Sequence, residues 1–392
     1  MSAFFIGIGQ DVSQKTGTYI YINEQSQLDS YCSQAAKAPV LALDTEFIRT
    51  RTLHSKLGLI QVFFGDEVAL IDPLCDLDLE PFWQLLTSPE IVKVLHSCHE
   101  DLEVFKRYAG RLPTPLFDTQ IAGQFLFQGK VLGFGAMVAQ ELGIVLDKGE
   151  ARTNWLKRPL SDNQLTYAVN DVKYLLPVYH KLNDQLAERG LQQFNLAEAE
   201  YKVSLKQKDK SLDNLFLDFG TAWQLKPREL AILQELAKWR LELARKKDLA
   251  LGFVAKDATL VSIAQRRPAD MNSLKNIPGV MHQEVSRYGK SMLACVQVAK
   301  ALDIDECPVK VPRVTDFSDY KQSYKVLRQN ITDVATEHGI PIEMMATKKQ
   351  LNQWIKWSLN MPYADKPDFN QTWRFPLLQD VLEQWQNTYT NK

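Results

Sequence analysis

The sequence predicts a mixed α/β domain followed by two small all-α domains. Short runs rich in β-branched and aromatic residues fill roughly the first hundred residues, and amphipathic helical patterns follow them to about residue 200. From residue 222 onward every periodic stretch is helical. The chain of 392 residues also exceeds the roughly 250 to 300 residues at which a single core stops growing. An α/β domain joined to helical modules accounts for all three observations.

The strands of the predicted sheet lie in the first hundred residues. We expect the first four of them to form its antiparallel part, with Gly65-Asp66 as a hairpin turn, and the last to be a buried strand. Their expected ranges are Tyr19–Ile22, Val40–Phe47, Leu57–Phe64, Glu67–Ile71 and Ile91–Leu95.

Helices follow the strands within the same domain. Ser161 and Gln164 have the spacing of a capping box, in which each side chain bonds the backbone of the other, so a helix begins there. The expected ranges are Glu80–Leu86, Glu100–Tyr108, Asp118–Leu126, Phe134–Leu142 and Ser161–Leu176.

The remaining residues predict two helical units of similar size. A charged stretch broken at Gly220 separates the first unit from the α/β domain, and Pro308 and Pro312 separate the second from the first. The expected divisions are a loose tail at 1–17, the α/β domain at 18–205, a linker at 206–221, a helical domain at 222–302, a linker at 303–318 and a second helical domain at 319–392.

Composition restricts the classes of protein to which the chain could belong. No apolar run approaches the roughly 20 residues that span a bilayer, and the apolar N-terminal run lacks a basic segment before it, so we expect a cytoplasmic protein. The five cysteines form no CxxC pair and are expected to be free thiols. Acidic residues are in excess up to residue 200 and basic residues beyond it, which suits a metal-binding half joined to a polyanion-binding half. We expect a monomer.

Two carboxylates on one predicted strand are the first candidate site residues. Asp44 and Glu46 are two apart and therefore share a face of the strand, where burial of both is costly unless a cation compensates. Asp101 lies in the first turn of a helix after a strand, a usual place for a site in α/β domains. Tyr167 and Asp171 are four apart on one helix and share a face.

These residues predict a divalent metal site. The oxygen ligands of Asp44, Glu46, Asp101 and Asp171 suit Mg²⁺ or Mn²⁺, and two such ions could clamp a phosphodiester while Tyr167 orients the attacking water. Taken singly, each residue has an ordinary alternative interpretation. An isolated DxE pair commonly faces solvent, Asp101 could cap a helix, and Tyr167 with Asp171 could be a surface pair.

Three motifs around these residues resemble the DEDDy exonuclease family. They are LDTEF at 43–47 followed by IRTRT, HSCHEDLEVF at 96–105, and LTYAVNDV at 165–172, whose tyrosine four residues before the last aspartate distinguishes this subclass. LGLIQVF, DTQIA and WLKRPLS also resemble ribonuclease D. His99 departs from the pattern, since a small residue is expected there.

The helical part resembles HRDC domains. AWQLKPREL, IPGV and SRYGK resemble a first HRDC domain, and MATKKQLNQW with TWRFPLL resembles a more divergent second copy. The resemblance covers residue 18 to the end. It implies a ribonuclease H-like exonuclease fold, two metal ions, and 3′→5′ hydrolysis of RNA that releases nucleoside 5′-monophosphates. The substrates that it implies are tRNA precursors and other small structured RNAs with 3′ trailers.

Further residues are predicted to contact the nucleic acid. Thr45, Phe47 and Arg49, on or next to the acidic strand, are expected to hold the terminal nucleotide. The lysine pairs Lys246-Lys247 and Lys348-Lys349 are candidates for phosphate contacts, although a solvated helix face is an equally good interpretation of each pair.

Two other functions stay open on the sequence alone. A 3′→5′ DNA exonuclease would share the tyrosine signature, although the tandem helical modules favour RNA. A catalytically silent RNA-binding protein would use the helical domains as a platform, although the presence of all five site residues argues against it.

Overall fold

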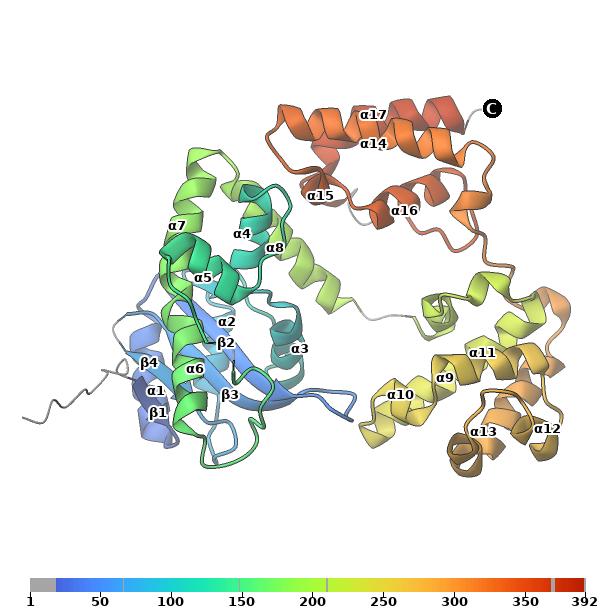
Figure 1. Ribbon diagram of the computed structural model, residues 1–392, viewed down its shortest axis with the longest axis horizontal. Coiled ribbons are helices and arrows are strands. Elements are labelled where there is room, and N and C mark those ends of the chain that lie inside the picture. The colour runs from blue at the N-terminus through green and yellow to red at the C-terminus, as the bar shows by residue number, and fades with distance from the viewer. Residues whose placement is uncertain (1–18, 66, 148, 209–210, 368–370, 391–392) are drawn as a thin grey trace, which may run out of the picture.

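A computed structural model describes residues 19–65, 67–147, 149–208, 211–367 and 371–390 (Figure 1). The predicted tail at 1–17 and the turn residue Asp66 lie outside these ranges. The first domain contains a six-stranded mixed sheet with the strand order β1-β4-β3-β2-β5-β6. The strands are β1 Tyr19–Ile22, β2 Val40–Ile48, β3 Lys56–Phe63, β4 Val68–Ile71, β5 Val92–Leu95 and β6 Leu116–Asp118.

Strand β2 lies inside the sheet and carries the first two candidate acids. It pairs antiparallel with β3, where Asp44 is opposite Gln61, and parallel with β5 as far as Ala42 opposite Val94. The register with β3 shifts between Glu46 and Phe47. Such an irregularity bends a strand and changes the direction of its side chains. Here it follows directly after the two acids, where β2 leaves the site.

The mixed sheet flanked by helices confirms the predicted fold class, but one predicted pairing was wrong. Strand β1 pairs parallel with β4, not antiparallel. No helix was predicted at Gln25–Ala35, where a helix carries the chain away from β1 so that β1 does not pair with the next strand. Strand β6, with only three residues, was also missed.

The helices of the first domain continue into a long connection. The predicted helix from Ser161 is confirmed, with both bonds of its capping box, but it ends at Lys173 and a separate helix follows. No separate helix was predicted beyond Leu176. The helices are α1 Gln25–Ala35, α2 Glu80–Leu86, α3 His99–Tyr108, α4 Thr119–Leu126, α5 Phe134–Leu142, α6 Asp162–Lys173, α7 Leu175–Glu188 and α8 Gln192–Gln207.

The first helical domain has a hydrophobic core of its own. Its buried side chains, from Phe216 to Cys307, form a cluster separate from that of the rest of the protein. Its elements are the 3₁₀ helices η1 Leu212–Asp218, η2 Ala222–Gln224 and η3 Ile304–Glu306, and the α-helices α9 Pro227–Lys247, α10 Leu251–Val254, α11 Asp257–Arg266, α12 Met271–Lys275 and α13 His282–Ala301.

The second helical domain packs against the α/β domain, and the two share one continuous hydrophobic cluster. Trp373 bridges them, because its ring lies 5.9 Å from that of Phe125 and 5.0 Å from that of Phe194 between ring centroids. The elements of this domain are η4 Val314–Asp316, α14 Tyr320–Glu337, α15 Ile342–Met345, α16 Lys348–Ser358 and α17 Phe375–Tyr389.

The first helical domain also contacts the first domain, at the connection between β2 and β3 (Figure 1). The backbone N–H of Ala250 donates to the carbonyl of Arg51 at 2.8 Å, and the N–H of His54 donates to Asp248 Oδ1 at 3.1 Å. The guanidinium of Arg51 lies over the Phe253 ring. Within the described residues, no helix has the length and apolar character needed to cross a bilayer.

Candidate active site

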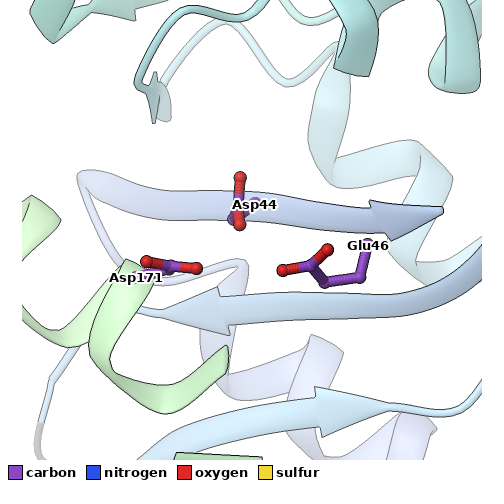
Figure 2. Close-up of side chains that lie close together, drawn as sticks. All are labelled: Asp44, Glu46 and Asp171. Carbon is purple, nitrogen blue, oxygen red and sulfur yellow. The ribbon is translucent and has the colours of Figure 1, made fainter. Parts of the chain in front are cut away.

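Three of the predicted acids meet where α6 crosses the sheet. Asp44 and Glu46 project from the same face of β2, and Asp171 reaches them from α6 (Figure 2). One carboxylate oxygen of each lies within 4.8 Å of one in both others. Glu46 is buried, whereas Asp44 and Asp171 remain partly accessible. The cluster is therefore not completely sealed from solvent.

The fourth predicted acid, Asp101, lies beside this group without being part of it. It is buried in the first turn of α3, the helix that follows β5, and it accepts a hydrogen bond from the Thr45 hydroxyl. Its charge nevertheless acts on Asp44 and Glu46. Thr45 is itself buried, so its hydroxyl orients Asp101, and its predicted contact with substrate stays a prediction.

The four carboxyl groups hold their protons more tightly than ordinary acids do. Burial, followed by the charges of Asp171 and Asp101, raises the pKa of Glu46 to about 9. Burial raises the pKa of Asp101 and of Asp171 to about 7. The pKa of Asp44 is also well above its usual range, because of burial and then the charges of Asp101 and Asp171.

These raised pKa values mean that the folded chain brings negative charges together without enough compensation of its own. A divalent cation would supply that compensation, and a set of carboxylate oxygens is the chemistry that Mg²⁺ and Mn²⁺ prefer. The residues present therefore fit a divalent metal site.

Tyr167 lies one turn before Asp171 on α6. Burial, followed by the charges of Asp171, Glu46 and Asp44, raises its pKa above the usual value. Its hydroxyl is a hydrogen-bond partner of the Asp171 carboxylate. The phenol therefore stays protonated at neutral pH and acts as a hydrogen-bond donor beside the acids, not as a strong base.

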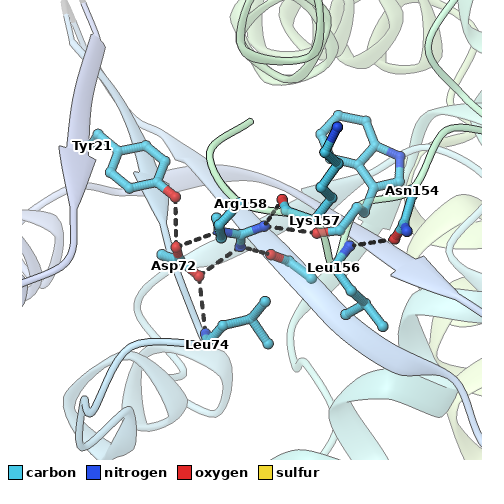
Figure 3. Close-up of polar contacts among 9 residues, drawn as sticks. Tyr21, Asp72, Leu74, Asn154, Leu156, Lys157 and Arg158 are labelled. Atoms are coloured by element: carbon cyan, nitrogen blue, oxygen red, sulfur yellow. Dashed lines mark hydrogen bonds and ion pairs between the residues drawn. The ribbon is translucent and has the colours of Figure 1, made fainter. Parts of the chain in front are cut away.

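The loop before α6 is fixed by a network that the sequence analysis did not identify (Figure 3). The Arg158 guanidinium donates twice to Asp72, at 2.6 Å each, and also to the carbonyls of Gly58 at 2.6 Å and Trp155 at 2.9 Å. The Tyr21 hydroxyl donates to Asp72 at 2.6 Å. This network ties the loop to β1, β3 and the end of β4.

Close packing supports the same loop. A Cβ atom placed on Gly58 would lie 2.7 Å from the Trp155 carbonyl oxygen, so only glycine fits there. The buried Trp155 ring then lies 6.1 Å from the Tyr167 ring between centroids. The network thereby positions α6, which carries Tyr167 and Asp171. The WLKRPLS segment was the available signal, but its partners are remote in sequence.

Replacing Arg158 with methionine should lower kcat by loosening α6 and should destabilise the protein by about 3 kcal/mol, because the Asp72 carboxylate would stay buried without its cation. Burial alone would raise the pKa of Asp72, but the hydrogen bonds from Arg158 and then from Tyr21 outweigh it and lower that pKa. Steady-state kinetics below the melting transition, together with urea unfolding, measure both effects.

Lysine at position 158 is the matched control. It keeps the charge but cannot bond two carbonyls and both carboxylate oxygens at once, so it should restore part of the stability and less of kcat. An Arg158→Met enzyme with unchanged kcat would show that the network does not position the site.

The predicted nucleic-acid contacts occupy three separate places. Phe47 is half-buried against the core, and the exposed Arg49 pairs with Glu103 at 3.0 Å. Lys246 and Lys247 are exposed in the last turn of α9. Lys348 and Lys349 are exposed in the first turn of α16. Both lysine pairs lie on helices of the helical domains, whereas the acid cluster lies on β2 and α6 of the first domain.

Three family models match the chain in the same order as the structural domains. Residues 19–187 match a 3′-5′ exonuclease model, residues 229–296 match the HRDC domain, and residues 318–382 match the C-terminal HRDC domain of ribonuclease D.

Relatives match over almost the whole chain. Ribonuclease D of Shewanella sp. (strain ANA-3) is 39% identical, covering 95% of this chain and 95% of that protein. Ribonuclease D of Escherichia coli (strain K12) is 39% identical, covering 93% and 97%. The crystal structure of Escherichia coli RNase D, described as an exoribonuclease involved in structured RNA processing, has a TM-score of 0.90 at 38% identity and covers 95% of this chain and 99% of that one.

The mixed sheet with its acidic cluster, followed by HRDC domains, defines a metal-dependent 3′–5′ exonuclease with helical C-terminal modules. Identity of 39% over nearly the full length specifies the kind of exonuclease. The chain belongs to the ribonuclease D family, and its activity is that of a 3′–5′ exoribonuclease.

Proposed function

We propose that this exoribonuclease trims the 3′ trailers of tRNA precursors and other small structured RNAs and releases nucleoside 5′-monophosphates. The observation that carries the chemistry is the convergence of Asp44, Glu46 and Asp171, with Asp101 beside them. A relative described as acting in structured RNA processing supports the class of substrate.

The four carboxylates would hold two divalent ions, Mg²⁺ or Mn²⁺. When bound, such ions would attract the phosphodiester and promote deprotonation of the attacking water. The protein's own part is to hold the four acids in place and to aim the water. The Tyr167 hydroxyl, whose raised pKa keeps it protonated and whose proton points to Asp171, would orient the water that attacks the last phosphodiester by accepting a hydrogen bond from it.

Hydrolysis consumes one water for each nucleotide removed. The water oxygen bonds to phosphorus, and the bond from phosphorus to the 3′ oxygen of the preceding nucleotide breaks. That oxygen takes a proton, so the shortened RNA ends in a 3′ hydroxyl and the product is a 5′-monophosphate. Thr45, Phe47 and Arg49, on or just after β2, would hold the terminal nucleotide.

We also propose the division of the chain into domains and linkers. The bounds are 18–205 for the exonuclease domain, 222–302 for the first HRDC domain and 319–392 for the second, with linkers at 206–221 and 303–318, from which Phe216, Cys307 and Val314 pack into the neighbouring cores. The breaks at Gly220, Pro308 and Pro312 support these bounds. We propose a monomer that acts in the cytoplasm, where tRNA precursors are found.

Side-by-side digestion of a 3′-extended tRNA precursor and a single-stranded DNA of the same length tests this function. We expect Mg²⁺- or Mn²⁺-dependent release of 5′-monophosphates from the RNA, stopping near the mature 3′ end, and much slower release from the DNA. Tyr167→Phe should retain the RNA affinity and lower kcat. Equal rates on both polymers, or nucleoside 3′-monophosphates as products, would contradict the proposal.

A further inference from the structure

A large basic groove lies outside the acid cluster, between the two helical domains. Its volume is about 1150 Å³, and it is lined by the end of α8, the η1–η2 segment, residues 311–315, α16 and residues 363–366. Among the described residues that line it, only Asp365 is acidic. The basic ones are Lys208, Arg313, Lys348, Lys349, Lys356 and Lys366, and we call this cavity the lysine groove.

The lysine groove also offers aromatic surface. The Arg313 guanidinium lies 4.2 Å from the centre of the Trp223 ring, and Arg313 pairs with Asp316 at 2.6 Å. Phe219 and Tyr363 line the same cavity. Grooves that bind single-stranded nucleic acid have two features. Cationic side chains follow the nucleic-acid backbone, and aromatic rings stack on the bases.

The charges on α16 are not explained by the stability of that helix. Lys348 and Lys349 occupy its first turn, where the helix dipole disfavours cations. Thr347 and Gln350 already cap this end with a complete capping box, so the lysines are not needed to satisfy it. Their common feature is that both line the lysine groove.

The groove begins close to the active site along the chain. Lys206, near the end of α8, pairs with Glu103 at 2.7 Å and lies 3.0 Å from His99, both on α3 with Asp101. Lys208, two residues later, lines the groove. An RNA with its 3′ end at the acids would therefore pass the C-terminal end of α8 to reach the groove.

We propose that the lysine groove binds a single-stranded segment of the substrate RNA upstream of the nucleotide being removed. Lys348, Lys349 and Lys356 contact phosphates, and the face formed by Trp223 and Arg313 receives a base. This inference rests on the exoribonuclease activity, and it makes affinity depend on the length of the unpaired 3′ tail. A dinucleotide fills only the active site, whereas a longer tail reaches both places.

The test compares two double variants of the full-length protein. Lys348→Gln/Lys349→Gln removes two charges from the groove, and Lys321→Gln/Lys325→Gln removes two exposed charges from α14 of the same domain, outside the groove. The KM of each is measured for a dinucleotide and for single-stranded RNAs of increasing length. Thermal melting confirms that both variants are folded.

We expect the KM of the groove variant for long RNAs to be about tenfold higher, with kcat unchanged. Its affinity should no longer increase with the length of the RNA. The slope of log K against log salt concentration should become shallower by about 1.4. Each phosphate contact with a single strand contributes roughly 0.7 to that slope, and the variant loses two contacts. The dinucleotide should be hydrolysed as by the wild type. The proposal would be overturned if both double variants lost the same affinity for long RNA. It would also be overturned if the groove variant lost as much affinity for the dinucleotide as for long RNA. A wild-type protein that cleaves neither substrate would instead refute the exoribonuclease activity.

Discussion

Replacing Asp44 with asparagine is expected to abolish hydrolysis and, at the same time, to raise the melting temperature of the metal-free protein at mildly alkaline pH. The asparagine keeps the size of the side chain but removes one of the charges that repel each other in the acid cluster. The metal-free protein should be stabilised, because the asparagine has no charge for burial and the neighbouring acids to disfavour.

The same cluster should make the metal-free protein less stable as pH rises. A carboxyl whose folded pKa is raised binds more protons in the folded state than in the unfolded state, so its penalty is absent below the unfolded value of about 4. The penalty grows as pH rises above that value and levels off above the folded values, about 7 for Asp101 and Asp171 and about 9 for Glu46. Calorimetry in a chelator from about pH 5 to about pH 9 measures this trend, and added Mn²⁺ should reverse it.

Asp184→Asn is the matched control, because it removes an exposed acid from α7 outside the cluster. Its activity and its dependence of stability on pH should equal those of the wild type. If Asp44→Asn melts below the wild type in chelator at alkaline pH, or retains most of the activity, the cluster is not the metal site.

Two pairs of active-site residues could be predicted from the sequence, because each pair lies on a single strand or helix. Alternation along a strand places Asp44 with Glu46, and the helical repeat places Tyr167 with Asp171. The meeting of β2 with α6 was an inference from the order of the motifs and from a family resemblance. No periodic pattern could show that Asp101 would lie beside the other three acids and bond Thr45.

The parts that the sequence analysis missed depend on contacts between distant segments. Asp72 and Arg158 are 86 residues apart, and neither lies in a pattern that indicates its partner. The parallel pairing of β1 with β4 depends likewise on tertiary packing, because both strands have the same local composition as antiparallel ones. Helix α1 buries Leu28, Tyr31, Cys32 and Ala35, which have helical spacing, but the polar residues between them make this repeat weak in the sequence.

The contact between the second helical domain and the exonuclease domain contains a buried ion pair. Glu198 on α8 and Arg374, just before α17, lie 2.7 Å apart, and each side chain is 3% exposed. Trp373 Nε1 donates to the same carboxylate oxygen, Glu198 Oε2, at 3.2 Å, and Arg374 Nε donates to the Met344 carbonyl. The pair therefore links the two domains at a site that water does not reach.

Changing Arg374 to methionine should cost about 3 to 5 kcal/mol and release the second helical domain from the exonuclease domain, because Glu198 would remain buried without its main cation. Urea unfolding, limited proteolysis between residues 303 and 318, and the fluorescence of Trp373 should all register the release. The double variant Glu198→Gln/Arg374→Met should recover much of the loss, since the buried charge is then gone.

Lys202→Gln provides the comparison within the same network. Lys202 contacts Glu198 at 3.4 Å, but its side chain is 48% exposed, so its loss should cost at most about 1 kcal/mol. Should Arg374→Met cost no more than Lys202→Gln, the buried pair would not be what joins the domains. The lysine groove requires that joint, because residues of the second helical domain form one of its walls. Arg374→Met should therefore also weaken binding of long single-stranded RNA while sparing the dinucleotide.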